Sequence, residues 1–383
     1  MGSPSGQYSK LWFHRELTPG TKSATFGNPT GGSTYGLRLY QEEFQPRPTK
    51  TPIRYQENRG GVSFDNFDFT PGPQGVTGTL RFALRYSGVH AVMLGHVLGN
   101  LVTAGAAAVW NHIGDGGGSG RFNSLTFLHQ RPINDAGTTF IETQLLGAKI
   151  GRMRLTQSVS QPFIICEMDL VAMEAQVITA VTNNSNLPPD SNGFSPNEAL
   201  AYSAHIVDTA ALPQPHNFAF QEMPSGPVTY PQLEEWTIEL NNFPEQTGVI
   251  SNQTRQSSPA RGQIREVTGS FVMEQDDSID NVEKVFGNTS ADASLPFKLN
   301  WEYVNPLVAA EKLTMSVSNA YITQPERGTS GTGPQRRRYN FTALAGTISP
   351  LWPFDFVIGS TKQKPVGATL VSYGEYVTVT PSV

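Results

Sequence analysis

The stretch VTGSFVMEQDDSIDNVEKVFGN, residues 267–288, decides the fold because a related stretch occurs earlier in the chain. The earlier one is VTGTLRFALRYSGVHAVMLGHVLGN, residues 76–100. Both begin with the same three residues and both end in Gly-Asn. We therefore expect an internal duplication of a unit of about 150 residues, which is an ordinary domain size.

The two stretches also share a pattern of local structure. Nine positions separate the motif glycine from a serine in each, Gly78 from Ser87 and Gly269 from Ser278. Apolar and polar residues alternate after each glycine, which is typical of a half-buried strand. Each serine suits a helix N-cap, and the glycine near the end of each stretch suits a helix stop. Each copy thus predicts a strand followed by a short helix.

The composition favours an all-β protein. The chain has 383 residues, with 37 glycines and 28 prolines, and only 15% of its residues are charged. Such a chain is long enough for two or three domains rich in turns. The formal net charge of -5 argues against a nucleic-acid binder that works by neutralising phosphates.

Two further features limit the class of protein. Cys166 is the only cysteine and lies in an alternating apolar pattern, so it predicts a core residue and excludes an intrachain disulfide. Residues 87–114 carry no formal charge and are long enough to span a bilayer, but they contain three histidines and five glycines. A buried helix followed by a packed loop is the expected structure. The N-terminus has no apolar signal core.

Four segments follow from this pattern. Residues 1–50 are rich in Gly, Ser, Thr and Pro, and we expect an arm that gains order by packing on a neighbour, the alternative being a disordered terminus. The first β-domain is expected at residues 51–182 and the second at residues 217–383. Residues 183–216 are expected to form a linker or a long excursion.

The order of the expected strands is the same in both halves. Residues 140–156 predict a hairpin or bulged strands, because Gly147 and Gly151 interrupt them. In the second half, strand 297–303 takes the place of 125–129, strand 313–317 that of 151–156, and strand 339–345 that of 163–173. A last strand is expected at residues 376–380.

The sequence offers no catalytic, cofactor-binding or metal site, so we expect a protein that is not an enzyme and that needs no cofactor. The seven histidines lack metal-ligand spacing, and no nucleotide-binding or hydrolase motif occurs. The glycine-rich run 114–120 lacks the Lys and hydroxyl of a phosphate loop. Glu274, Asp276 and Asp277 suit the start of a helix. Arg336-Arg337-Arg338 predicts either a basic hairpin tip or a contact to an acidic face of another subunit.

The chain resembles the bacteriophage tail tube proteins, also called major tail proteins, over about residues 50–350. The residues that carry the resemblance are Arg265-Glu266 leading into 267–271, the strand 236–242 that ends in two asparagines, and the paired strands 146–156 and 163–171. The resemblance implies two tandem domains, each a β-sandwich or split barrel with a short flanking helix. It also implies that the chain is a structural protein of the virion tail, in which rings of these domains stack into a hollow tube.

The resemblance implies partners as well. In the virion these are further copies of the chain in homotrimeric, pseudo-hexameric rings, the tape measure protein, the tail terminator, distal tail or baseplate proteins, and DNA that passes through the tube during ejection without tight binding. Assembly would take place in the host cytoplasm, with no membrane partner. Glu274, Asp276, Glu167 and Asp169 are candidates for an acidic or neutral wall of the lumen, against the alternative of ordinary outer surface. A baseplate or capsid-decoration protein and a carbohydrate-binding β-sandwich stay open as other classes.

Overall fold

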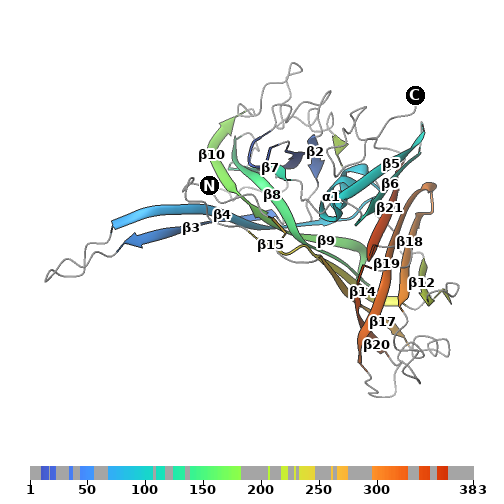
Figure 1. Cartoon of the computed structure of the whole chain (residues 1–383). Coiled ribbons are helices and arrows are strands. Elements are labelled where there is room, and N and C mark those ends of the chain that lie inside the picture. The colour runs from blue at the N-terminus through green and yellow to red at the C-terminus, as the bar shows by residue number, and fades with distance from the viewer. Residues whose placement is uncertain are drawn as a thin grey trace.

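The computed structural model is an all-β structure, as the composition predicts (Figure 1). It contains 21 strands and one helix among the residues that it describes. Nineteen of these strands belong to one hydrogen-bonded network. The structure describes residues 10–16, 18–22, 34–37, 44–55, 68–106, 109–116, 124–133, 139–182, 206–207, 217–222, 228–229, 233–245, 260–261, 265–274, 296–326, 336–345 and 352–360.

The centre of the first unit is an antiparallel sheet with the strand order β3-β4-β9-β8. Apolar residues alternate with polar ones along these strands, and the apolar side chains of Leu80, Met168 and Met153 lie fully buried on one face. This is the period of two that the sequence shows. The strands are β3 (Phe44–Tyr55), β4 (Asp68–Ala83), β8 (Thr139–Ser158) and β9 (Gln161–Ala172).

Strand β8 is one long bulged strand. Its second half pairs with β9, and its first half pairs with β7 (Leu125–Pro132) and β10 (Glu174–Thr182). Gly147 lies between the halves with φ +65°, a conformation that favours glycine. A Cβ atom there would lie 2.5 Å from the sulfur of Met173, so the site also lacks room for a side chain.

The predicted first helix is confirmed as α1 (Gly88–Leu98). Ser87 Oγ accepts a hydrogen bond of 3.2 Å from Val89 N, and Gly99 ends the helix with φ 85°. Every residue of α1 is buried, which fits a helix that carries no formal charge and whose only polar side chains are His90 and His96. The segment after α1 is a hairpin of β5 (Asn100–Ala106) and β6 (Val109–Asp115), where the sequence predicted a packed loop.

The second unit repeats the strand order of the first, as β14-β17-β20-β19-β18. Strand β21 pairs with both β19 and β6 and so connects the second unit to the first. Strands β12 and β13 extend the sheet beyond β18. The bounds are β12 (Asn217–Glu222), β13 (Val228–Thr229), β14 (Leu233–Asn241), β17 (Glu266–Glu274), β18 (Phe297–Asn305), β19 (Val308–Glu326), β20 (Arg336–Ala343) and β21 (Phe354–Ser360).

The repeat extends to the register of the strands. The motif valines Val76 and Val267 each pair with an alanine, Ala172 on β9 and Ala343 on β20. The first residue of β7, Leu125, pairs with Ala148. The first residue of β18, Phe297, likewise pairs with Ala320, and a register shift follows in both strands. Strands β4, β7, β8 and β9 therefore correspond to β17, β18, β19 and β20.

This register corrects one expected correspondence. Val317 pairs with Leu299, as Leu145 pairs with Phe127. Residues 313–317 therefore take the place of the first half of β8, whereas the sequence suggested residues 151–156. The apolar and polar residues of 313–317 alternate as those of the second half of β8 do, which is why the pattern alone suggested residues 151–156.

The two units join through backbone pairing. Strand β14 of the second unit pairs with the second half of β8, from Arg152–Asn241 to Ser158–Glu235. The sheet therefore runs without a break from β3 through β8 and β14 to β20, and Figure 1 shows it curving from one unit into the other. The apolar face of this sheet carries one hydrophobic core that includes residues of both units.

The N-terminal segment is not only an arm. Strand β1 (Lys10–Arg15) pairs with β7, and also with β2 (Thr34–Leu37), which pairs in turn with β11 (Ile206–Val207). Leu11, Trp12 and Phe13 are 0% exposed. The expectation that this segment orders only on a neighbour is wrong for β1, because its apolar run completes the core of its own chain.

Several predictions lie outside the described residues. They are the second helix after Ser278, the strand 376–380, most of the linker 183–216 and most of the glycine-rich run 114–120. The expected domain boundary at residue 51 falls within β3.

Candidate functional site

The side of the sheet opposite the core carries polar side chains over neighbouring strands of both units. Backbone pairing places Arg81, Glu167, Arg154 and Glu239 in one row across β4, β9, β8 and β14, and the row continues to Thr268 and Thr342. We call this surface the polar face. We restrict the name to the following half-buried or exposed residues in and around this row: Thr79, Arg81, Arg152, Arg154, Glu167, Asp169, Thr237, Glu239, Asn241, Thr268, Ser270, Asn340 and Thr342.

The charges of the polar face are balanced. Its charged members are three arginines and three carboxylates, and they alternate along the row from Arg81 to Glu239. Opposite charges directly across antiparallel strands attract one another. The part of the face that β17 and β20 provide carries hydroxyl and amide side chains. The face as a whole is therefore hydrophilic with a formal charge near zero.

Arg152 is the best connected of these charges. Its guanidinium contacts Asp169 at 2.7 Å, Glu167 at 3.5 Å and Glu239 at 3.7 Å. Burial lowers the pKa of Arg152, but Asp169 above all, with Glu239 and Glu167, raises it on balance above its ordinary value. Glu167 and Asp169, the expected acidic contributors, are thus held in ion pairs.

The arginine run is also paired within the chain. Arg336 Nε lies 3.0 Å from Glu234 Oε1, and Arg338 Nη2 lies 3.4 Å from Glu235 Oε2. The three arginines begin β20, where they pair with the end of β17. Arg336 and Arg338 thus meet carboxylates of β14 within the chain, and a contact to an acidic face of another subunit stays a prediction.

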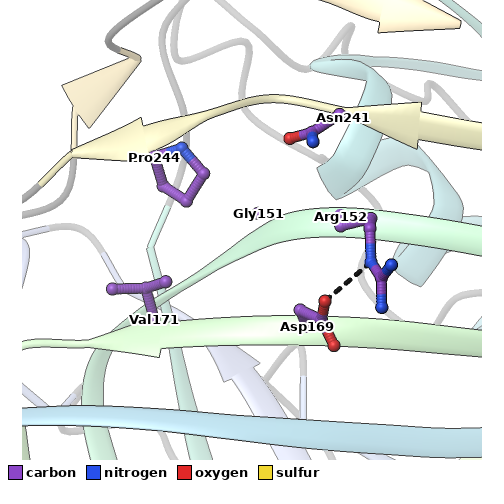
Figure 2. A pocket seen from close by; sticks show the side chains of 6 residues that line it. All are labelled: Gly151, Arg152, Asp169, Val171, Asn241 and Pro244. Carbon is purple, nitrogen blue, oxygen red and sulfur yellow. Dashed lines mark hydrogen bonds and ion pairs between the residues drawn. The ribbon is translucent and has the colours of Figure 1, made fainter.

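A shallow open depression marks the point where the second unit meets the first (Figure 2). It is lined by Gly151, Arg152, Asp169, Val171, Asn241 and Pro244. Pro244 begins β15 (Pro244–Glu245), which pairs with β16 (Ala260–Arg261). A Cβ atom on Gly151 would lie 2.6 Å from Pro244 Cγ, so the glycine lets the proline approach the bulge of β8.

Asn242 holds this junction from the buried side. Its side-chain Nδ2 donates to Val97 O at 3.0 Å and to Ile150 O at 3.4 Å, and its Oδ1 accepts from Arg265 Nε at 2.8 Å. Its backbone N–H donates to Gly151 O at 2.7 Å. One buried amide therefore connects α1, β8 and the start of β17. The sequence identified the asparagine pair only as a strand end.

The histidines of the described part of the chain are structural. Those described, His14, His90, His96, His112 and His129, are buried, and no cluster of metal-binding side chains occurs among the described residues. Burial lowers the pKa of His112 to about 4. Burial, with Arg131 nearby, lowers the pKa of His129 to about 3. His205 and His216 lie outside the described residues.

The other candidate groups are the thiol of Cys166 and the carboxylates at the end of β17. Cys166 is buried as predicted, and burial raises the pKa of its thiol. Glu274 ends β17 opposite Arg336, whereas Asp276 and Asp277 lie outside the described residues.

Sequence reasoning missed the buried carboxylate of Glu16, as it missed those of Glu142 and Glu311. Glu16 accepts hydrogen bonds of 2.8 Å from Gly20 N, Thr126 Oγ1 and Gly147 N, and so fixes the N-terminal segment to the bulge of β8. A single acidic residue after β1 gives no signal of this role in the sequence.

The helix of the described residues, α1, has 11 residues and is too short to cross a membrane, and no candidate span occurs in that part of the chain.

These features define a structural β-protein with an internal duplication and a polar sheet face shared by both units. The family described as phage tail tube protein matches residues 6–345, so the chain belongs to the phage tail tube proteins, as its resemblance indicated. It is a structural protein of the bacteriophage tail tube and a component of the virion tail. No curated protein matches the chain significantly.

Proposed function

We propose that this protein is the major tail protein of its phage and that it polymerises as stacked rings into the tube. The observation that carries the proposal is the repeated register of the two units, joined by β8 and β14 in one sheet. Two similar units per chain present head-to-tail surfaces, and such heterologous contacts close into rings. Three chains would then complete a ring of six units with pseudo-sixfold symmetry.

The proposed domains are residues 51–182 and 217–383, connected by residues 183–216. The pairing of β1 with β7 and of β3 with β4 brings parts of residues 1–50 to the first domain. The other residues of this N-terminal segment are proposed to bridge adjacent subunits or rings. Each domain acts as one sixth of the ring wall.

We assign the polar face to the lumen. A tube that conducts DNA needs a hydrophilic wall without an excess of unpaired cations, because lysine and arginine contacts to phosphates add up along many rings. The ion pairs of Arg152 with Asp169, Glu167 and Glu239 support this assignment. Before ejection the polar face surrounds the tape measure protein in the lumen. During ejection it allows the genomic DNA to pass.

The remaining proposed partners are proteins at the two ends of the tube. The end rings would contact the tail terminator at one end and distal tail or baseplate proteins at the other. Assembly would take place in the host cytoplasm. The protein performs no catalytic step in this account, since its role is to form a wall.

Negative-stain electron microscopy of the purified chain, with mass measurement of isolated rings, tests the proposal. Hollow tubes or rings that contain three chains are expected. Six chains in a ring would contradict the pseudo-sixfold arrangement, and a protein that stays monomeric at high concentration would contradict the function.

A further inference from the structure

The junction between the two units offers a template for the junction between two chains. Within the chain, the last strand of the first unit's central sheet, β8, pairs with the first strand of the second unit, β14. The corresponding strands at the two ends of the chain's sheet are β19 and β3. If the units repeat around a ring, β19 of one chain meets β3 of the next.

The correspondence of β3 with β14 rests on their neighbours, β4 and β17, which correspond to each other. Trp236 pairs with Phe271 on β17, and Phe44 pairs with Leu80 at the same distance from the motif valine on β4. Both aromatic side chains are buried, Trp236 at 2% and Phe44 at 3% exposure. Continuing along the strands, Glu239 corresponds to Arg47.

The correspondence of β19 with β8 includes an irregularity in the pairing. The register of β8 on β9 shifts between Ile150 and Arg152, and the register of β19 on β20 shifts between Ile322 and Gln324. The shift follows Leu170 in one unit and Phe341 in the other, which are corresponding residues. Glu326 therefore corresponds to Arg154.

The two outer edges are available among the described residues. The only described pairing of β3 is with β4, and residues 321–326 of β19 have described pairings only with β20. In the first unit, the corresponding part of β8 begins at residue 149, and from residue 152 on it pairs with β14. Figure 1 shows the hairpin of β3 and β4 projecting away from the body of the protein.

We propose that β3 of one copy of this chain adds antiparallel to the outer edge of β19 of a second copy, in the register that β14 adopts on β8. This inference rests on the proposed ring and names its contact surface. Arg47 then lies opposite Glu326, where the chain's own junction has Glu239 opposite Arg154. The charges are exchanged between the two junctions, and each junction brings an arginine to a glutamate.

Prolines make the junction between chains weaker than the one within a chain. Asn242 donates its backbone N–H to Gly151 O. In an antiparallel strand the N–H and C=O groups of every second residue point to the same neighbour, so those of residues 240 and 238 also point toward β8. The corresponding residues of β3 include Pro46 and Pro48, and Pro325 of β19 corresponds to Met153. These residues have no N–H to give, which protects free edges from wrong pairing. The contact then depends on side chains and on closure of the ring.

The hairpin base follows the same template. The register of β3 on β4 shifts between Lys50 and Pro52, so Pro52 corresponds to Pro244 and Thr323 to Gly151. Pro244 lies against Gly151 in the depression of Figure 2. In the second junction the base of the projecting hairpin crosses β19 of the neighbouring copy near Thr323.

Disulfide cross-linking in the full chain tests the register. Arg154 and Glu239 lie directly opposite each other without backbone hydrogen bonds between them. The Cα atoms of such a pair are about 4.5 Å apart, a separation that suits a disulfide. The variant R47C/E326C should give disulfides between chains under oxidation of assembled protein, with a covalent trimer as the largest product. The matched variant R154C/E239C should give a disulfide within the chain, and R47C or E326C alone should give none.

Charge exchange provides a second measurement with folded protein. R47E should raise the protein concentration needed for assembly by about fivefold or more, because like charges then face each other at every junction. R47E/E326R should restore the wild-type value, and thermal melting of each soluble variant shows that it is folded.

The outcomes separate this inference from the proposed function. Wild-type tubes together with an R47C/E326C variant that assembles and gives no product between chains would overturn the register alone. A failure of R47E/E326R to recover while its fold is intact would do the same. A wild-type chain that never self-associates would contradict the ring and the junction together.

Discussion

Gly147 and Asn319 occupy the same position in the two long strands, and both have positive φ, +65° and +53°. Each directly precedes the alanine that pairs with the first residue of β7 or β18. The bend that lets β8 serve two sets of neighbours is thus repeated in β19. Asparagine tolerates this conformation better than other non-glycine residues.

This relationship gives a pair of unequal expectations. Asn319→Gly should lower stability by no more than about 1–2 kcal/mol, because glycine adopts the positive φ and only the contacts of a buried amide side chain are lost. Gly147→Val should lower stability by about 2–4 kcal/mol, because it adds backbone strain and a contact with Met173. Thermal melting of the soluble chain measures both. Equal losses in the two variants would contradict the claim that conformation limits these positions.

Asn242 should be more sensitive than its neighbour. Asn242→Ala removes the buried hydrogen bonds to Val97 O, Ile150 O and Arg265 Nε and should cost about 2–4 kcal/mol. Asn241→Ala removes one half-buried bond to Phe243 N and should cost about 1 kcal/mol or less. Denaturant unfolding followed by tryptophan fluorescence compares them. The reverse order of sensitivity would show that the junction is held elsewhere.

The N-terminal strand should stabilise the monomer. Trp12→Ala should cost about 3–5 kcal/mol because the side chain is fully buried in the described structure. Lys10→Ala, at the start of the same strand, serves as the control. Hydrogen exchange of β7 should rise in Trp12→Ala. A variant that melts like the wild type and fails only to assemble would restore the interpretation of this segment as an arm.

Acid should weaken the fold through its buried histidines. The pKa values of His112 and His129 fall from 6.5 to about 4 and about 3 on folding. A depressed folded-state pKa gives stability that is present above pH 6.5 and is lost as the pH falls toward these values, because the unfolded chain takes up protons first. His129→Phe, beside Phe44, should reduce the loss of melting temperature between pH 7 and pH 4. An unchanged pH dependence would assign the acid sensitivity to other groups.

The all-β class, the first helix with its cap and the repeated strand order were predictable, because period-two alternation and capping residues are local signals. The end of α1 at Gly99 needed only the sequence. The continuity of β8 through Gly147 and the place of β1 were not predictable, since both depend on distant partners such as Glu16 and β7.

The candidate surface was predictable only in part. Glu167 and Asp169 were expected on an outward strand face, and they lie there. Their partner Arg152 lies on another strand, and the register that brings it within 2.7 Å of Asp169 depends on a bulge. The sequence left an acidic and a neutral wall open, because pairing of this kind depends on the fold.

Helical reconstruction of tubes formed by the purified chain tests the central claim most directly. The account predicts a ring of three chains in which both units present their polar face to the lumen and β3 of each chain lies beside β19 of the next. A ring of six chains with one unit outside the wall, or a channel lined by the apolar face or by unpaired arginines and lysines, would contradict it.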